Sequence, residues 1–192
     1  EIRLSLVGSE MCIRDRLLFH IDYETYANGA QYISIFLTPA TVSLAVPLYR
    51  QLELLKTYPK AIFGGIIAGV LTAMVSVFAL SLMFGLNHEQ YVTLLPKSIT
   101  TAIGMGISEK MGGIVTITVV VIIVTGILGN ILADTICHLC KIEDPIAKGL
   151  AIGTSAHALG TAKAMELGEI EGAMSSLSIV VCGILTVISV SI

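Results

Sequence analysis

Long stretches without a charged residue alternate with short polar segments along this chain. Four charge-free runs cover residues 25–49, 61–87, 111–133 and 172–192. An α-helix rises about 1.5 Å per residue, so roughly 20 residues cross the hydrocarbon core of a bilayer, and each run is long enough to do so. The pattern predicts an all-α, polytopic membrane protein.

Two polar segments between these runs resemble each other. They are SITTAIGMGISEKMG at 98–112 and GTSAHALGTAKAMELG at 153–168, related by a shift of 56 positions. Ser98 and Thr101 are three residues apart, as are Thr154 and His157, and residues three apart share a helix face. We interpret the segments as two related polar faces inside a membrane, which is typical of a transport site.

The chain repeats a unit that consists of a polar segment, a short charged stretch and a full membrane span. In the 56-residue register, Gly104 falls on Gly160 and Gly112 on Gly168. Residues 39–86 follow the same plan, and three loose copies suggest an architecture built by duplication. Whether the polar segments cross the membrane or double back inside it stays open, because the two topologies differ by one basic residue in the positive-inside count.

Pro39 and Pro47 interrupt the first apolar run. Each proline removes a backbone donor and clashes with the preceding turn. The segment FLTPATVSLAVPLY at 36–49 is therefore either a discontinuous helix or an ordinary span with a proline kink, and the sequence favours neither.

The composition supports a membrane protein and argues against nucleic-acid binding. Hydrophobic residues make up 55% of the chain and charged residues 13%, and the mean hydropathy is +0.89. The net charge is −3, and there is neither a tryptophan nor a basic tract. The loop at 50–60 is the most basic short loop, so the positive-inside rule places it in the cytoplasm.

Residues 1–16 differ from the rest of the chain. EIRLSLVGSEMCIRDR mixes charged and apolar residues without the pattern of a signal peptide. We interpret residues 1–16 as a non-native or disordered leader and residues 17–192 as one membrane domain.

The polar segments supply groups that bind a small anion. Helix N-termini, hydroxyls and an occasional cation provide desolvated donors near the middle of the bilayer. The candidate substrate-binding residues are Ser98, Thr100, Thr101, Thr154, Ser155, His157 and Thr161. Lys97 and Lys163 either attract an anion or extend to the lipid headgroups, and the glutamates after Lys163 favour the second role for it. We expect Thr101 and His157 to meet in one shielded pocket.

Alternative roles exist for these side chains. A single Ser or Thr commonly bonds to a carbonyl of its own helix, and a buried histidine can simply bond a neighbouring carbonyl. Ser155 and His157 are two positions apart, so on a helix they face away from each other and do not form a nucleophile–base pair. Because HExxH, GxSxG and a pair of intramembrane aspartates are lacking, we expect no enzyme, and a lone CxxC at 137–140 predicts no metal site. No cofactor is predicted.

Three motifs resemble those of the LrgB/CidB family of bacterial membrane proteins, called antiholin-like. They are FLTPATVSLAVPLYRQL, PKSITTAIGMGIS and GTSAHALGTAKAMELGEIEGAMSSL, and they occur in the family's order within residues 17–192. Ala102 departs from the family pattern, since many members have proline there. Members usually have further membrane-spanning sequence before this point, so the resemblance implies a copy truncated at its N-terminus.

The resemblance implies two functions. One is a partner of small, holin-like LrgA proteins that restrains murein hydrolase activity and so influences autolysis and programmed cell death. The other is a carrier, because plant plastid relatives that look like LrgA–LrgB fusions move glycolate and glycerate, and bacterial relatives are linked to pyruvate. We expect a multi-pass protein of the bacterial plasma membrane that carries small monocarboxylates, with an LrgA-type partner and a homo-oligomeric state as further expectations. The alternative is an antiholin-like regulator of a pore without transport of its own.

Overall fold

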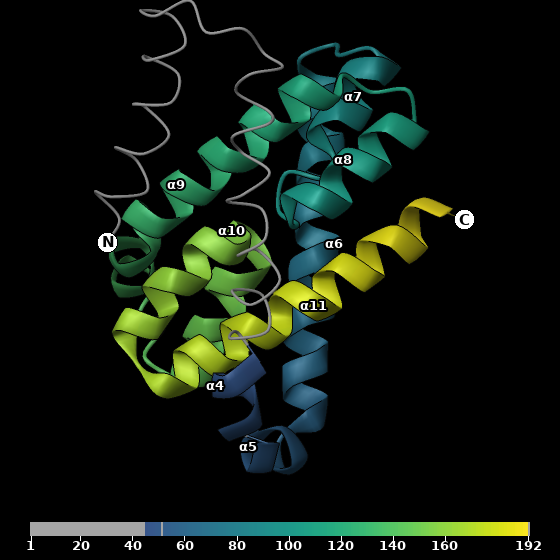
Figure 1. The fold of residues 1–192 in the computed structure, drawn as a ribbon. Coiled ribbons are helices and arrows are strands. Elements are labelled where there is room, and N and C mark those ends of the chain that lie inside the picture. Colours follow the sequence, from purple (N-terminus) through teal and green to yellow (C-terminus); the bar gives the residue numbers. More distant parts are fainter. Residues whose placement is uncertain (1–44, 51, 192) are drawn as a thin grey trace, which may run out of the picture. The chain divides into compact units, whose positions relative to one another are not determined.

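The computed structural model of the chain describes residues 45–50 and 52–191, and every element in these ranges is an α-helix (Figure 1). The helices are α4 (Ala45–Arg50), α5 (Leu52–Thr57), α6 (Pro59–Met83), α7 (His88–Leu94), α8 (Thr101–Lys110), α9 (Val115–Leu139), α10 (Pro145–Leu167) and α11 (Glu169–Ser191). The predicted all-α class is confirmed for the described residues. The leader at 1–16 and most of the proline-containing segment at 36–49 lie outside them.

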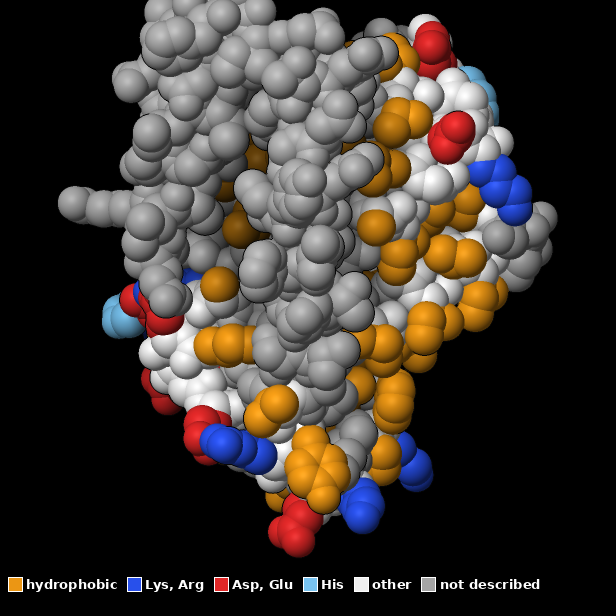
Figure 2. All heavy atoms as spheres, viewed as in Figure 1, with side chains coloured by type: hydrophobic (Ala, Val, Ile, Leu, Met, Phe, Trp, Pro, Cys, Tyr) orange, Lys and Arg blue, Asp and Glu red, His pale blue; other side chains and the backbone are white. Residues whose placement is uncertain are grey.

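Three of these helices are long and apolar enough to cross a membrane. They cover Pro59–Met83, Val115–Leu139 and Glu169–Val190, close to three of the predicted runs. Their outward faces carry large exposed apolar side chains, such as Phe63, Leu71 and Phe78 on α6. Figure 2 shows these apolar side chains spread over the described surface, with charged groups mainly at its margins. A surface of this kind is expected where lipid is the solvent.

Local sequence signals set the helix ends. Pro59 stands at the first turn of α6, where a backbone N–H has no partner within the helix. Asn87 begins α7 with a capping box, since its side chain accepts from the Gln90 N–H at 2.8 Å and the Gln90 side chain accepts from the Asn87 N–H at 3.0 Å. Asp144 caps α10 by accepting from the Ala147 N–H at 2.9 Å.

The second polar segment doubles back on itself within α10. His157 has φ 43° and ψ −139°, which breaks the helix into one arm before it and one after it. A Cβ placed on Gly160 would lie 3.0 Å from Ile152 Cγ2 and 3.2 Å from Ile152 O. Eight residues of straight helix would separate these positions by about 12 Å, so the two arms form a hairpin. In Figure 1, α9 and α11 run as long rods, whereas α10 occupies a compact region between them.

The first polar segment also returns on itself. A Cβ on Gly104 would lie 3.6 Å from both Cβ and O of Pro96, again eight residues earlier. The buried Thr118 hydroxyl of α9 lies 2.9 Å from the Thr93 carbonyl of α7 and 2.7 Å from the Ser108 hydroxyl of α8, which joins the two ends of this hairpin. Both polar segments therefore double back on themselves.

The hairpins and the long helices repeat at the 56-residue spacing that relates the two polar segments in the sequence. Helices α6 and α9 both have 25 residues and begin at positions 59 and 115, which are 56 apart. The hairpin contacts 104 to 96 and 160 to 152 are related by the same shift. Their origin by duplication stays a prediction.

Candidate functional site

A groove of about 620 Å³ lies between α6, the turn before α8 and the first arm of α10. We call it the α6/α10 groove. Its lining residues are Ala61, Gly65, Gly69, Thr72, Ala73, Ser76, Lys97, Ser98, Asp144, Ile146, Ala147, Leu150, Ala151, Thr154 and Ser155. It thus brings together Lys97, Ser98, Thr154 and Ser155, which the sequence analysis took from two separate segments.

Small residues on α6 allow this close approach. A Cβ on Gly69 would lie 2.7 Å from Thr154 Oγ1, and a Cβ on Gly65 would lie 3.0 Å from Leu150 Cδ1. Larger side chains at either position would push α6 away from α10 or displace its side chains. The narrow contact between α6 and α10 therefore depends on glycine at these two positions.

Lys97 and Ser98 form the donor end of the groove. Lys97 Nζ donates to Ser98 Oγ at 3.0 Å, and among the described residues Lys97 has no acidic partner within ion-pair distance. The Ser98 hydroxyl proton has no acceptor among these residues, so it is available to a ligand. Burial lowers the pKa of the Lys97 ammonium below its ordinary value, because desolvation disfavours the charged form. An uncompensated, half-buried cation beside a free hydroxyl favours an anion.

The other hydroxyls of the groove donate to their own helices. Thr154 Oγ1 donates to Leu150 O at 2.8 Å, Ser155 Oγ to Ala151 O at 2.7 Å, and Thr72 Oγ1 to Ala68 O at 2.7 Å. Their oxygen lone pairs remain as acceptors. Asp144 also lines the groove, where it is exposed and its Oδ1 accepts from the Ala147 N–H at the start of α10. The groove therefore combines donors at Lys97 and Ser98 with hydroxyl acceptors on the opposite wall.

A cavity of about 10 Å³, close to the size of one water, continues behind the groove. It is lined by Val70, Ala73, Met74, Leu95, Ser98, Ile99, Thr154, Cys182 and Thr186. Ala73, Ser98 and Thr154 line both spaces, so they form the constriction between the groove and α11.

Four of the predicted binding residues lie elsewhere. Thr100 is the N-cap of α8 and Thr101 its first residue, both half-buried. His157 is 4% exposed and lies against α9, while the fully buried Thr161 hydroxyl lies 3.0 Å from the His157 carbonyl and 2.6 Å from the Ser175 hydroxyl. Thr101 and His157, which we expected to share a pocket, do not share this groove. Ser98 and Thr154 meet there instead.

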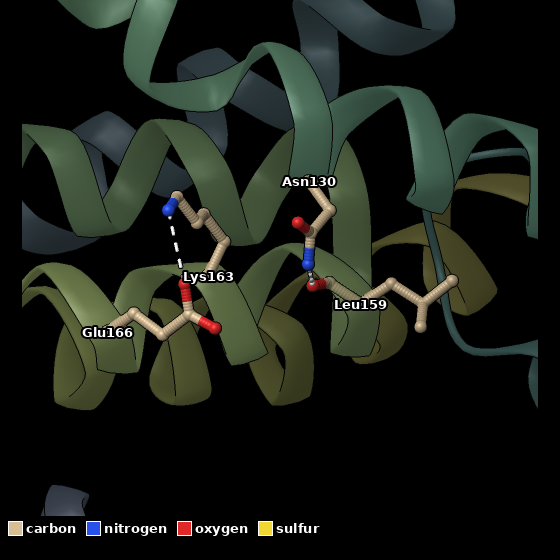
Figure 3. Close-up of polar contacts among 4 residues, drawn as sticks. All are labelled: Asn130, Leu159, Lys163 and Glu166. Atoms are coloured by element: carbon tan, nitrogen blue, oxygen red, sulfur yellow. Dashed lines mark hydrogen bonds and ion pairs between the residues drawn. The ribbon is translucent and has the colours of Figure 1, made fainter. Parts of the chain in front are cut away.

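Lys163 lies outside the groove and pairs with an acid. Its Nζ is 3.1 Å from Glu166 Oε2 (Figure 3). Nearby, Asn130 Nδ2 donates to Leu159 O at 2.7 Å, which ties α9 to the second arm of α10. The buried Asn130 Oδ1 has no hydrogen-bond partner among the described residues. The contact with Glu166 agrees with a surface role for Lys163.

The sequence analysis missed the α6 wall and Asn130. The α6 wall had a signal, because Gly65, Gly69, Thr72 and Ser76 recur at spacings of four, three and four and so form one stripe of small and polar residues along the helix. The signal for Asn130 was weaker, because it is a single amide side chain near the end of an apolar run.

Comparison with known proteins gives consistent matches. The sequence model of the LrgB-like family matches residues 6–192. The "Uncharacterized protein YxaC" of Bacillus subtilis (strain 168) is 37% identical over 169 residues, which are 88% of this chain and 74% of that protein. The "Antiholin-like protein LrgB" of Bacillus cereus (strain B4264) is 40% identical over 166 residues, 86% of this chain and 72% of that protein, and the protein of strain AH187 gives the same values. No solved structure matches.

Proposed function

Because the chain belongs to the LrgB-like family and has an anion-favouring groove between its membrane helices, we propose that it is a carrier of small monocarboxylates such as glycolate or pyruvate. The observation that carries this proposal is the Lys97–Ser98 pair, which lacks an acidic partner among the described residues and lines the groove. We do not propose an enzyme, because the sequence lacks the HExxH and GxSxG motifs.

The groove offers complementary chemistry to each part of such a substrate. The carboxylate accepts from Lys97 Nζ and the Ser98 hydroxyl, in charge-assisted hydrogen bonds. Ala73 and Leu150 provide apolar wall for the carbon chain. In glycolate, the substrate hydroxyl donates to Thr154 or Ser155, whose own protons are held by helix carbonyls.

The hairpins suit a carrier better than an open pore. Transporters commonly place binding sites where discontinuous helices meet near the middle of the bilayer. Here the groove narrows at Ser98 and Thr154, one residue from each hairpin, and only a water-sized cavity follows. Release toward α11 requires the two hairpins to move apart.

The proposed setting is the bacterial plasma membrane, with an LrgA-type protein as partner. Altered murein hydrolase activity and autolysis would then follow from changed metabolite flux. The name of the Bacillus cereus relatives favours a second candidate, an antiholin-like regulator of a holin-type pore without transport of its own.

Uptake of labelled glycolate and pyruvate into proteoliposomes tests the carrier. We expect saturable uptake that Lys97→Gln and Ser98→Ala each reduce by about tenfold or more, since a hydrogen bond to a charged group contributes roughly 1.5–3 kcal/mol. Lys110→Gln is the matched control, because Lys110 is exposed at the end of α8 and does not line the groove. Leakage of an encapsulated dye without saturable uptake would refute the carrier and indicate a pore, whereas the absence of both uptake and leakage would support the regulator.

A further inference from the structure

His157 is a buried ionisable side chain at the break of α10, and it does not line the groove. It is 4% exposed, and its φ of 43° lies in a region that non-glycine residues rarely adopt. Backbone strain of this kind persists where the surrounding structure enforces it, and it is concentrated at functional sites. The chain thus maintains an unfavourable backbone conformation to place this imidazole between α9 and α10.

The contacts of the imidazole fix its neutral tautomer. Nε2 lies 2.9 Å from Ile122 O, and because a carbonyl only accepts, Nε2 carries the hydrogen. Nδ1 then holds a lone pair, and it has no hydrogen-bond partner among the described residues. Gly126 makes room for the ring, since a Cβ there would lie 2.5 Å from His157 Cε1. One ring nitrogen is therefore anchored and the other remains free to bind a proton.

No charged side chain on the packed helices compensates a protonated imidazole. Residues 61–83 of α6, 115–133 of α9 and 172–191 of α11 contain no Asp, Glu, Lys or Arg, and Cys182 is their only titratable group. On α10 itself, Lys148 lies nine residues before His157, and Lys163 and Glu166 pair with each other. Glu109 and Lys110 of α8 are exposed at its C-terminal end. Because an isolated charge in such surroundings is costly, the imidazole is neutral when the groove is empty.

We propose that His157 Nδ1 takes up a proton together with the anionic substrate, which makes the protein a proton-coupled monocarboxylate symporter. This inference rests on the proposed function. Thr154, one helical turn before His157, lines the groove, so an anion bound there adds a negative charge on the same helix. It also neutralises the Lys97 ammonium, whose charge disfavours a second cation when the groove is empty. The anion favours the imidazolium and the imidazolium favours the anion, and by linkage the two effects are equal.

The proton balance of this step is simple. A proton from one aqueous side adds to Nδ1 while Nε2–H stays bonded to Ile122 O, and the same proton leaves Nδ1 on the other side. Each turnover then moves one proton and one anion together, while Lys97 keeps the same charge in the loaded and the empty carrier. Transport is therefore electroneutral.

Wild-type protein in proteoliposomes with an internal pH dye tests the coupling. With labelled pyruvate outside, we expect saturable uptake with internal acidification, roughly tenfold accumulation per unit of pH gradient for one proton per anion, and no accumulation from a potassium diffusion potential. Protein-free vesicles correct for diffusion of the undissociated acid. Saturable uptake without acidification overturns this inference alone, whereas the absence of saturable uptake refutes the proposed function.

His157→Gln separates proton coupling from a structural role. Glutamine retains an N–H donor for Ile122 O but does not titrate. At an alkaline pH where the wild-type imidazole also stays neutral, we expect exchange of labelled for unlabelled pyruvate to stay within roughly threefold of wild type, while accumulation driven by the pH gradient falls from about tenfold to none. Ser175→Ala, which removes a hydroxyl from the same buried region, is expected to retain accumulation. Full accumulation in His157→Gln, or loss of exchange together with accumulation, would overturn the proposal.

Discussion

Gly69 provides the sharpest test of how α6 packs against α10. In Gly69→Ala the new Cβ would lie 2.7 Å from Thr154 Oγ1, 2.9 Å from its Cβ and 3.0 Å from its Cγ2. All three separations are shorter than ordinary van der Waals contact. Gly64 lies on the same helix, is exposed, and has nothing within 4 Å of an added Cβ, so Gly64→Ala is the matched control.

The two substitutions have opposite expected effects on stability. Alanine is favoured over glycine in a helix interior by about 0.5–1 kcal/mol, so Gly64→Ala should be neutral or stabilising. Gly69→Ala gains the same term but overpacks the interface, which typically costs about 1–3 kcal/mol. The difference between the variants is then about 1–3 kcal/mol in the free energy of unfolding, with Gly69→Ala the less stable.

Thermal unfolding in detergent measures this difference. For a chain of this length, 1 kcal/mol corresponds to a change of roughly 2–4 °C in the melting temperature. Adding Thr154→Ala to Gly69→Ala removes two of the three close contacts and should recover part of the loss, as a positive coupling in a double-mutant cycle. Equal melting temperatures for Gly69→Ala and Gly64→Ala would contradict the packing described here.

Three further outcomes follow from the same structure. Because burial lowers the pKa of Lys97, anion affinity should fall at a pH below the ordinary pKa of a lysine, where Lys97 loses the charge that binds the carboxylate. In binding measured against pH, Lys97→Arg should retain affinity to a higher pH. Asn130→Leu should melt within a few degrees of wild type, since it removes both the hydrogen bond to Leu159 O and the unsatisfied Oδ1. Asn130→Asp should melt at a far lower temperature, because it loses the donor and buries a charge. The reverse order of melting temperatures would refute this account. Cys182, 2% exposed, should react with a permeant maleimide much more slowly than the exposed Cys140 when labelled peptides are quantified, and equal rates would contradict its burial.

The long helices could be predicted because length and hydropathy are local properties. The predicted runs 61–87 and 111–133 correspond to α6 at Pro59–Met83 and α9 at Val115–Leu139. The ends differ by a few residues because capping decides them. Pro59 begins α6 before the apolar run starts, and α9 continues beyond the run, past Asp134, to Leu139.

The doubling back of α10 could not be predicted, because it depends on non-local contacts. Nothing in the sequence around His157 excludes a straight helix, and the charge count separated the two topologies by one residue. The break is enforced by α9, where Ile122 O accepts from the imidazole and Gly126 leaves room for it. The break also explains why Thr154 lines the groove and His157 does not, since a straight helix would have kept both residues on one face.

The contacts between hairpins and spans explain why Ser98 and Thr154 are the residues that meet. Ile103 of the first hairpin packs on Gly183 of α11, and Leu159 of the second packs on Gly126 of α9. Ile103 and Leu159 are 56 positions apart, so each hairpin contacts the span that follows the other one. An approximate two-fold relation between two units would produce such an exchange, and this relation, like the duplication, stays a prediction. Residues near such an axis would meet their own equivalents. Ala73, Ser98 and Thr154 line both the groove and the cavity behind it, and of these Ser98 and Thr154 are also 56 positions apart.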